Sequence, residues 1–414
     1  MNKKRAILHS DLNSFYASVE MMLNPSLQGK AVAVCGSTED RRGIVLAKSE
    51  KAKKAGVKTG MAIWQAKQRC SDLVVVSPHY DQYLKYSKMA RTIYRRYTDQ
   101  VEPYGMDEAW CDVTGSRSLF GDGMTIAEEI RKAVKNELGL TVSIGVSFNK
   151  VFAKLGSDMK KPDAITQITP DNYKEKVWPL PSSDMFFIGR STALKLAKYN
   201  ITTIGDVAQT SMDFLEHLLG KNGLMIWACA NGEDVSRVQR EDFTPPIKSF
   251  GHGTTCREDL LNTNEVWKVI LYLSQDLGTK LRSHDLMARG VQLTVKNTKL
   301  EYSQYQEQLI WPSQNARDIA NAAMKIFRAR YLWYNPVRAL SVRAINLIRS
   351  DFPIQLTIDH SADVFLRYQK LESVMDTIKS RFGDDSICPA TICTNDKLPK
   401  GEVHQFISPD MLRN

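Results

Sequence analysis

The sequence predicts a multidomain α+β protein, and three observations lead to this fold class. Strands alternate with helices through about residue 167, which predicts a sheet with helices packed on it. Short helical segments replace this pattern from 171 to about 240. Residues 247–348 follow the order β-α-β-β-α-β, which suggests a compact ferredoxin-like unit. A chain of 414 residues is also too long for a single hydrophobic core.

The elements of the N-terminal part follow from apolar runs and helical spacing. Asn24-Pro25 ends the first helix, and a tyrosine-rich stripe on the longest helix is expected to pack in the core. The predicted strands cover 1–11, 31–35, 44–47 and 73–76, and the predicted helices cover 14–24, 48–56, 61–70 and 81–98.

The remaining elements are predicted in the same way, with Pro162 ending a basic helix and Pro245-Pro246 marking a linker over 241–246. Strands are expected at 101–113, 141–148, 248–256, 290–296, 301–308 and 339–347, and helices at 124–137, 149–162, 191–198, 263–283, 315–331 and 365–381. The tail after the last helix has no predicted element.

The charge balance favours a polyanionic partner. The net charge is +10, and residues 41–69 carry nine basic residues against one acid. Residues 246–348 carry fourteen Lys and Arg against eight Asp and Glu. No segment has the length and apolarity to cross a bilayer or to act as a signal peptide, so we expect a cytoplasmic protein without a membrane partner. The seven scattered cysteines are expected to be reduced thiols, with Cys388 and Cys393 the only close pair.

Three carboxylates have an unusual setting. Asp107 and Glu108 interrupt the apolar run 101–113, and Asp11 ends the first strand immediately before a helix. An Asp-Glu pair alone is more typical of a hairpin turn. If the two strands are neighbours, however, the three carboxylates meet at one sheet edge, and such a cluster requires cations. Hard oxygen ligands select Mg²⁺, which points to metal-assisted phosphoryl chemistry.

Three motifs, in order, resemble those of the Y-family translesion DNA polymerases of the DinB/UmuC kind. They are Asp11-Leu-Asn-Ser-Phe-Tyr16-Ala-Ser-Val-Glu20, Tyr104-Gly-Met-Asp107-Glu108-Ala, and Ser143-Ile-Gly-Val-Ser-Phe-Asn-Lys-Val-Phe-Ala-Lys154-Leu-Gly-Ser-Asp158-Met-Lys-Lys161-Pro162. The resemblance spans about residues 4–350. It implies a right-hand polymerase with a ferredoxin-like palm at 1–23 and 77–167, small fingers at 24–76, a helical thumb with a helix-hairpin-helix-like turn at 168–240, a DNA-binding little finger at 247–348, and a C-terminal tail at 349–414.

The resemblance also implies a two-metal nucleotidyl transfer. Asp11, Asp107 and Glu108 match the family's catalytic carboxylates, which with the backbone carbonyl of Leu12 would bind two Mg²⁺ ions, with Mn²⁺ as an alternative. Tyr16 falls at the steric gate that excludes a ribose 2′-hydroxyl. Lys161 matches the lysine that holds triphosphate oxygens, whereas Lys150 and Lys154 could equally be solvated surface lysines.

The fingers depart from the family pattern. Ala47, Glu50 and Lys53 stand where the family usually has Thr, Tyr and Arg, so weaker or rearranged nucleotide binding is expected, with Lys48 or Lys51 in compensation. The resemblance assigns nucleotide binding to Phe15, Tyr16, Ala47, Lys53 and Lys161. Ile44 and Leu46 would roof the nascent base pair, and their bulk should narrow the range of bulky lesions accepted.

Further positions match the family's DNA and clamp contacts. Ile188 and Gly189 lie in the helix-hairpin-helix turn, where Phe187 replaces the first glycine. Arg338 and Arg343 lie on the final strand, with plain surface charge as the alternative. Gln355, Leu356 and Ile358 resemble a sliding-clamp peptide without its terminal aromatic, with an edge strand as the alternative.

The resulting hypothesis is a low-fidelity, template-directed DNA polymerase of damage bypass. Its expected partners are primer-template DNA, deoxynucleoside triphosphates and a sliding clamp, and the protein is expected to be a monomer at the bacterial nucleoid. Two alternatives stay open on the sequence. The altered fingers could belong to a catalytically weakened DNA-binding scaffold, and the carboxylates could belong to a palm-type nucleotidyl cyclase, although a cyclase needs no basic duplex-binding domain.

Overall fold

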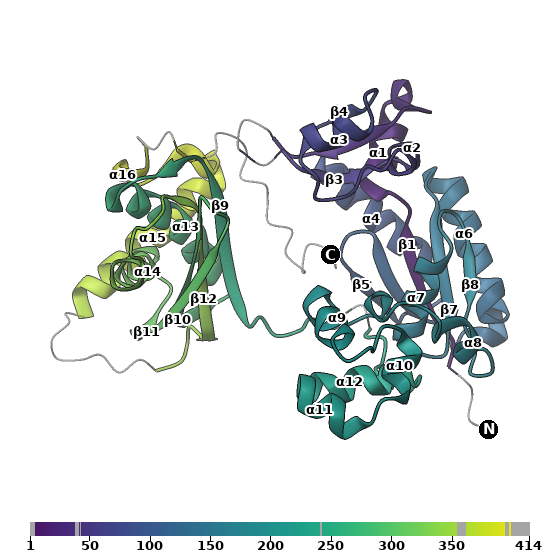
Figure 1. The fold of residues 1–414 in the computed structure, drawn as a ribbon. Coiled ribbons are helices and arrows are strands. Elements are labelled where there is room, and N and C mark those ends of the chain that lie inside the picture. Colours follow the sequence, from purple (N-terminus) through teal and green to yellow (C-terminus); the bar gives the residue numbers. More distant parts are fainter. Residues whose placement is uncertain are drawn as a thin grey trace. The chain divides into compact units, whose positions relative to one another are not determined.

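A computed structural model describes residues 5–37, 41, 43–240, 242–353, 362–393 and 397–398. The chain divides into two compact units, which are described separately (Figure 1). The first unit contains residues 44–244 and the N-terminal 36 residues, and the second contains residues 245–404. Among the described residues, no helix combines the length and apolarity needed to span a membrane.

A five-stranded sheet forms the centre of the first unit. Its strand order is β5-β6-β1-β7-β8, and β1 pairs antiparallel with both β6 and β7. The strands are β1 (Ile7–Leu12), β5 (Val101–Tyr104), β6 (Glu108–Asp112), β7 (Val142–Ser147) and β8 (Ile165–Gln167). Every residue of β1 is buried, so this strand lies in the middle of the layered structure.

Alternation along β1 sends its side chains to two different layers. Leu8 and Leu12 join the core with helices α4 (Tyr80–Arg95) and α6 (Gly123–Leu138), and the Ser10 hydroxyl bonds to Tyr94 of α4. His9 and Asp11 face helix α7 (Lys150–Met159) and the residues just after it. The period of two therefore places His9 and Asp11 on the face that α7 covers.

Gly145 allows α7 to approach the sheet closely. A Cβ at this position would lie 1.8 Å from the carbonyl oxygen of Ala153, so no other residue fits between β7 and α7. The opposite side of α7 packs against the helical segment that follows, through Phe152 and Leu155. That segment comprises α8 (Tyr173–Val177), η2 (Ser182–Asp184), α9 (Arg190–Ala197), α10 (Ile204–Gln209), α11 (Met212–Leu219) and α12 (Lys221–Ala230).

A smaller three-stranded sheet completes the first unit. Its order is β3-β2-β4, with a parallel pair between β2 and β4. A small core of alanine, valine and cysteine side chains joins this sheet to two short helices. The elements are α1 (Phe15–Leu23), η1 (Pro25–Leu27), β2 (Val32–Cys35), β3 (Val45–Lys48), α2 (Glu50–Lys54), α3 (Ile63–Arg69) and β4 (Val74–Val76).

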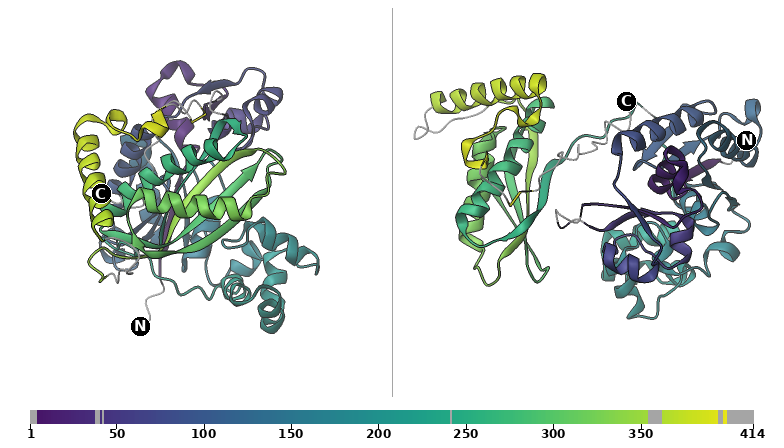
Figure 2. Two further views of the ribbon diagram at one scale, coloured as in Figure 1. Left: turned by 90° about the vertical axis from the view of Figure 1, so that its left-hand side faces the viewer. Right: turned by 90° about the horizontal axis from the view of Figure 1, so that it is seen from above.

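The second unit has the predicted β-α-β-β-α-β order. Its antiparallel sheet has the strand order β11-β10-β12-β9, and its two long helices cover one face (Figure 2). Gln292 and Gln306 hydrogen bond across neighbouring strands on the other face, which is half-exposed and polar. The elements are β9 (Ser249–Leu260), α13 (Thr263–Ser283), β10 (Leu286–Asn297), β11 (Tyr302–Ser313), α14 (Ala316–Arg330) and β12 (Val337–Arg349).

The tail helix α15 (Ala362–Phe382) belongs to the second unit. Arg282 of α13 binds Glu372 and Asp376 of α15, and the Glu372 carboxylate also accepts the backbone N–H of Ala316 at the start of α14. Two short helices not predicted from the sequence follow, η3 (Asp384–Ser386) and α16 (Ala390–Cys393). Residues in the described part of the tail therefore have defined packing.

The prediction of one strand over 101–113 is wrong. The segment forms a hairpin, β5 and β6, that turns at Gly105 with φ of +68°. A hairpin turn and a carboxylate site are compatible here, because Asp107 closes the turn and Glu108 begins β6. The three-residue strand β8 and the one-turn helix α5 (Arg117–Phe120) were also missed, because periodicity is undetectable over three or four residues.

Candidate active site

The pairing of β1 with β6 brings the three predicted carboxylates to one end of the sheet. Asp11 lies directly opposite Glu108 in the antiparallel register. The backbone N–H of Leu12 donates to the carbonyl of Asp107 at 2.9 Å, which fixes the hairpin turn against the end of β1. The cluster therefore depends on two elements that are far apart in the sequence but adjacent in the sheet.

The three carboxylates have different electrostatic surroundings. Burial, together with the charges of Asp11 and Glu108, raises the pKa of Asp107 to about 6. Burial also raises the pKa of Asp11, although Lys161 Nζ lies 2.5 Å from its Oδ2 atom. Burial alone would raise the pKa of Glu108, but hydrogen bonds from His9 and Lys154 outweigh it and lower this pKa to about 2.

The donor atoms suit a hard divalent cation, although the side chains are not gathered around one point. In the part of the chain that the structure describes, no three His, Cys, Asp or Glu side chains form a ready metal-binding group. Lys161 binds Asp11 and Lys154 binds Glu108 instead, so two ammonium groups balance the charge of two of the three carboxylates. No basic side chain among the described residues forms an ion pair with Asp107, whose pKa is raised by burial and then by the charges of Asp11 and Glu108.

The lysines that follow β7 have distinct positions. Lys161 bridges Asp11 and Asp158, the latter at 2.8 Å. Lys150 pairs with Glu102 at 2.7 Å and lies over the Trp110 ring, 4.5 Å from its centroid. Lys150 is thus engaged with the β5–β6 hairpin, whereas Lys161 and Lys154 contact the carboxylates themselves.

A buried polar chain behind Glu108 was not predicted. His9 is fully buried, with its Nδ1 atom 2.8 Å from the Ser157 hydroxyl and its Nε2 atom 3.1 Å from Glu108. Burial lowers the pKa of His9, and a neutral ring protonated at Nε2 donates to the ionised Glu108 carboxylate. One sequence signal was available, because His9 lies two residues before Asp11 on the same strand and so shares its face.

Tyr16 is held rigidly beside the cluster. Its ring stacks on Tyr83 with centroids 4.2 Å apart and planes 7° apart, and it meets the edge of Tyr80 at 6.0 Å. Burial and the nearby charge of Asp107 raise the pKa of Tyr16, which places its hydroxyl within the field of the carboxylates. Phe15 is only 3% exposed, and its backbone N–H belongs to the first turn of α1, where N–H groups have no partner within the helix.

The substituted positions of the small sheet form a local network. The carboxylate of Glu50 accepts a hydrogen bond from Ser14 at 3.0 Å and lies 3.8 Å from Lys53. Lys48 donates to Thr59, and burial together with Lys53 lowers the pKa of Lys48. Glu50 is therefore directed at the start of α1, immediately before Phe15 and Tyr16.

The other fingers positions differ in exposure. Lys51 lies 3.8 Å from Asp72. Ala47 and Leu46 are half-buried on β3, whereas the Ile44 side chain is 43% exposed. Ile44 is thus the accessible member of the two predicted roof residues.

The predicted phosphate turn lies at the start of α9. Gly189 caps this helix, whereas Ile188 is 5% exposed and its backbone N–H donates to the carbonyl of Met185. Phe187 has φ of +76° and a side chain that is 49% exposed. A pocket of about 360 Å³ joins residues 184–189 to Lys154 and Asp158 of α7.

The second unit contains the two predicted DNA-contact arginines. Both lie on β12, and Arg343 is exposed between the buried residues Val342 and Ala344, so it projects from the face opposite the helices. Its side chain lies across Gly251 of the paired strand β9. The clamp candidates Gln355, Leu356 and Ile358 lie outside the described residues.

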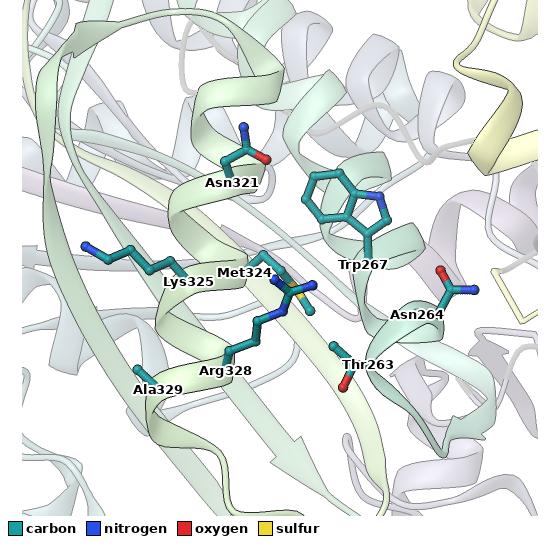
Figure 3. Close-up of a pocket in the computed structure, with 8 residues that line it drawn as sticks. All are labelled: Thr263, Asn264, Trp267, Asn321, Met324, Lys325, Arg328 and Ala329. Atoms are coloured by element: carbon teal, nitrogen blue, oxygen red, sulfur yellow. The ribbon is translucent and has the colours of Figure 1, made fainter. Parts of the chain in front are cut away.

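A pocket of about 770 Å³ lies between α13 and α14 of the second unit (Figure 3). Trp267 from α13 and Met324 and Arg328 from α14 face one another across it. This pocket is on the helical side of its sheet and contains none of the carboxylates of the first unit.

Comparisons with known proteins agree with this architecture. The model of the impB/mucB/samB family matches residues 10–158, and the model of that family's C-terminal domain matches residues 247–358. A protein named DNA polymerase IV from Acetivibrio thermocellus is 49% identical over 387 residues, which cover 93% of this chain and 96% of that protein. A protein named DNA polymerase IV 2 from Bacillus subtilis is 34% identical over 403 residues, covering 95% and 96%.

The fold comparison is equally extensive. A solved Y-family DNA polymerase chimera of Dbh and Dpo4 superimposes with a TM-score of 0.73 at 22% identity, covering 83% of this chain and 99% of that one. The predicted fold class is thereby confirmed. With near-complete coverage at 49% identity and both family models in order, the chain belongs to the impB/mucB/samB family, the Y family of DNA polymerases.

Proposed function

We propose that this protein is a template-directed, low-fidelity DNA polymerase that adds deoxynucleotides to a primer 3′ end during damage bypass. Family membership makes it a metal-dependent polymerase acting on primer-template DNA and nucleotides. The observation that carries the assignment to residues is the register that sets Asp11 opposite Glu108 with Asp107 at the adjoining turn. Three carboxylates at one end of the sheet would be unfavourable in a protein that only binds DNA, because without cations their burial and mutual repulsion lower its stability.

Asp11, Asp107, Glu108 and the Leu12 carbonyl would hold two Mg²⁺ ions, with Mn²⁺ as an alternative. When bound, such ions lower the pKa of the primer hydroxyl and stabilise charge on the triphosphate. Lys161 and Lys154 occupy the carboxylates in the structure described here. Release of Lys161 from Asp11 would free its ammonium group for the triphosphate oxygens, as its place in the family motif predicts.

Tyr16 is proposed to exclude ribonucleotides. Its ring cannot swing away easily, because Tyr83 stacks against it and is itself anchored to Glu20. Tyr16→Ala should raise ribonucleotide incorporation relative to deoxynucleotide incorporation by about 100-fold, the selectivity that shape alone achieves against one hydroxyl. Tyr16→Phe keeps the ring and should retain the discrimination.

Single-nucleotide incorporation on a primer-template tests the central proposal. The wild-type chain with Mg²⁺ should extend the primer, while Asp107→Ala and Glu108→Ala should not. A chain that binds duplex DNA in a gel-shift assay but never extends it would support the scaffold alternative. Failure to bind primer-template, with turnover of a free nucleotide, would support the cyclase alternative.

The roof residues are proposed to limit the lesions accepted. Leu46→Ala should increase extension past a bulky adduct while leaving extension on undamaged template nearly unchanged. Equal bypass by the variant and the wild type would contradict this role. Ile44→Ala is the matched comparison, because Ile44 is the more exposed of the two side chains.

Further assignments rest on the family pattern. We propose the palm at 1–23 and 77–167, the fingers at 24–76, the thumb at 168–240 and the little finger at 247–348. A monomer acting at the nucleoid of a bacterial cytoplasm, recruited by a sliding clamp through Gln355, Leu356 and Ile358, is consistent with its bacterial relatives. Loss of clamp-stimulated extension in a variant with all three residues changed to alanine tests the last point.

A further inference from the structure

Two of the seven cysteines differ from the rest in exposure. Cys35, Cys70, Cys111, Cys229 and Cys256 are buried, whereas Cys388 and Cys393 are exposed. Their sulfur atoms lie 2.8 Å apart, with one thiol donating to the other. Both belong to the tail, which the polymerase reaction proposed above does not use.

The local backbone turns the two thiols toward each other. Cys388 precedes Pro389, and Cys393 ends the short helix α16. The Cys393 thiol also approaches the carbonyl of Pro389 at 3.8 Å, which directs it back along the helix toward Cys388. The segment from Cys388 to Cys393 therefore forms a short loop with the two thiols in contact at its ends.

The segment is fastened on both sides. On the N-terminal side, α15 is held by the contacts of Arg282 with Glu372 and Asp376. On the C-terminal side, the Lys397 side chain binds Glu265 at 2.9 Å. The backbone carbonyl of Lys397 accepts a hydrogen bond from the N–H of Arg257. Leu398 is buried in the core of the second unit, and Ile392 packs against it. The contacts on both sides of the segment thus hold the two sulfur atoms close together.

We propose that Cys388 and Cys393 form a redox-responsive dithiol, which a low-molecular-weight disulfide oxidises to an intrachain disulfide. One cysteine thiolate attacks the reagent disulfide, whose S–S bond breaks, and one reagent thiol leaves. The second cysteine thiolate then attacks the mixed disulfide, forms the Cys388–Cys393 bond and releases the second reagent thiol. The protein loses two electrons and two protons, and the reagent disulfide becomes two thiols.

The geometry favours closure over a lasting mixed disulfide. A disulfide bond is about 2.05 Å long, so the sulfur atoms need to approach by only about 0.8 Å. The buried cysteines are shielded from the same reagent, and burial raises the thiol pKa of Cys111 to about 12. In a reducing compartment the dithiol is the resting form, and the bond forms on exposure to oxidant.

Oxidised glutathione added to the full-length, folded protein tests the inference. Intact-mass measurement should show the loss of two hydrogens, and peptide mapping without reduction should find residues 388 and 393 joined. Dithiothreitol should reverse the change. Cys388→Ser and Cys393→Ser should each retain one glutathione adduct, whereas Cys70→Ser should behave like the wild type.

Two outcomes would overturn the inference. The wild type could accumulate stable glutathione adducts at both positions, which would show that the pair does not close. Alternatively, both thiols could stay reduced at a glutathione ratio that oxidises a small dithiol reagent in the same tube. Thermal unfolding of each serine variant in reductant should match the wild type, which ensures that a negative result is not caused by misfolding.

Discussion

Phe187 adopts a backbone conformation that glycine normally supplies. Its φ of +76° lies in the left-handed region, which a residue with a β carbon enters at a cost of about 1 to 2 kcal/mol. The resemblance to the family implies glycine at this position, and Phe187 adopts a φ that glycine enters without strain. The half-exposed ring packs on Phe186 at 4.2 Å, so part of the strain is offset by contact.

Phe187→Gly should therefore raise the free energy of unfolding relative to Phe187→Ala by about 1 kcal/mol. Both variants lose the ring, but only glycine relieves the backbone strain. Urea unfolding of the two variants and the wild type provides the measurement. Equal stability of the glycine and alanine variants would show that the turn is not strained.

Asp107 should make stability depend on pH when metal is absent. Its folded pKa of about 6 lies above the unfolded value of about 3.9, so the folded state holds a proton that the unfolded state releases. In EDTA, its contribution is most favourable below about pH 4 and declines as the pH rises through about 6. Asp107→Asn should remove this decline and be about 2 kcal/mol more stable than the wild type at pH 8.

Urea unfolding in EDTA between pH 4 and 8 measures this difference. Asp171→Asn, at an exposed position, should follow the wild type throughout. Parallel curves for wild type and Asp107→Asn would contradict the buried-charge explanation. Saturating Mg²⁺ should reduce the difference, because a bound cation would stabilise the ionised form of Asp107.

At the residue scale, the sequence indicated which side chains converge but not how they pair. Asp11, Asp107, Tyr16 and Lys161 all lie near one sheet edge, as their motif positions imply. The contact of His9 with Ser157 spans 148 residues, and no local pattern announces it. Similarly, residue type alone left Lys154 undecided between a triphosphate contact and a surface lysine, and it did not indicate the ion pair with Glu108 that the structure shows.

At the element scale, long periodic segments were predicted well and short ones poorly. Helix 263–283 was placed to the residue, because its apolar spacing persists over five turns. The 101–113 hairpin was taken as one strand, since a turn led by Gly105 carries a weaker signal than the flanking apolar runs. Packing of α15 could not be predicted, because it depends on an ion pair with a helix about 90 residues away.

Arg282 is expected to be the main anchor of α15. The side chains of Arg282 and Glu372 are 12% and 6% exposed, so removal of the arginine leaves an uncompensated buried carboxylate. Arg282→Met should destabilise the second unit by about 3 kcal/mol. Adding Glu372→Gln should restore part of this loss, because it removes the stranded charge. Chemical unfolding of the full chain measures both effects.

Arg317→Met is the matched control for this experiment. Arg317 of α14 donates a hydrogen bond to Tyr368 of α15, but this contact lies on the exposed surface. Its replacement should cost less than about 0.5 kcal/mol. A similar loss in both arginine variants would mean that α15 is held by its whole surface rather than by the buried ion pair.

At the scale of the whole molecule, the fold class and the order of elements were predictable because each unit has its own hydrophobic pattern. Arg343 lies opposite Gln292 in the register of β12 and β10, on the polar face of the second unit, which is the face proposed to meet DNA. The contacts that close each unit were not predictable, since they join elements distant in sequence.

The salt dependence of DNA affinity should distinguish the polar sheet face of the second unit from its helical side. Arg343→Gln should reduce the slope of log affinity against log salt by about 0.9, and the double variant with Arg338→Gln by about twice that amount. Arg328→Gln removes the same charge from the helical side, where Figure 3 shows this residue, and should leave the slope unchanged. Fluorescence anisotropy over a salt series provides the measurement. An equal change in all three variants would indicate a nonspecific charge effect.

The ion pairs that hold α15 affect how the second unit responds to a force applied to the chain between β12 and this helix. That stretch leaves β12, an inner strand paired on both sides, and continues into a helix tied to α13. A pull directed along β12 would load two hydrogen-bonded ladders in shear at once, rather than peeling a terminus bond by bond. A pull directed along β12 is therefore expected to meet more resistance from the second unit than a pull directed across its sheet.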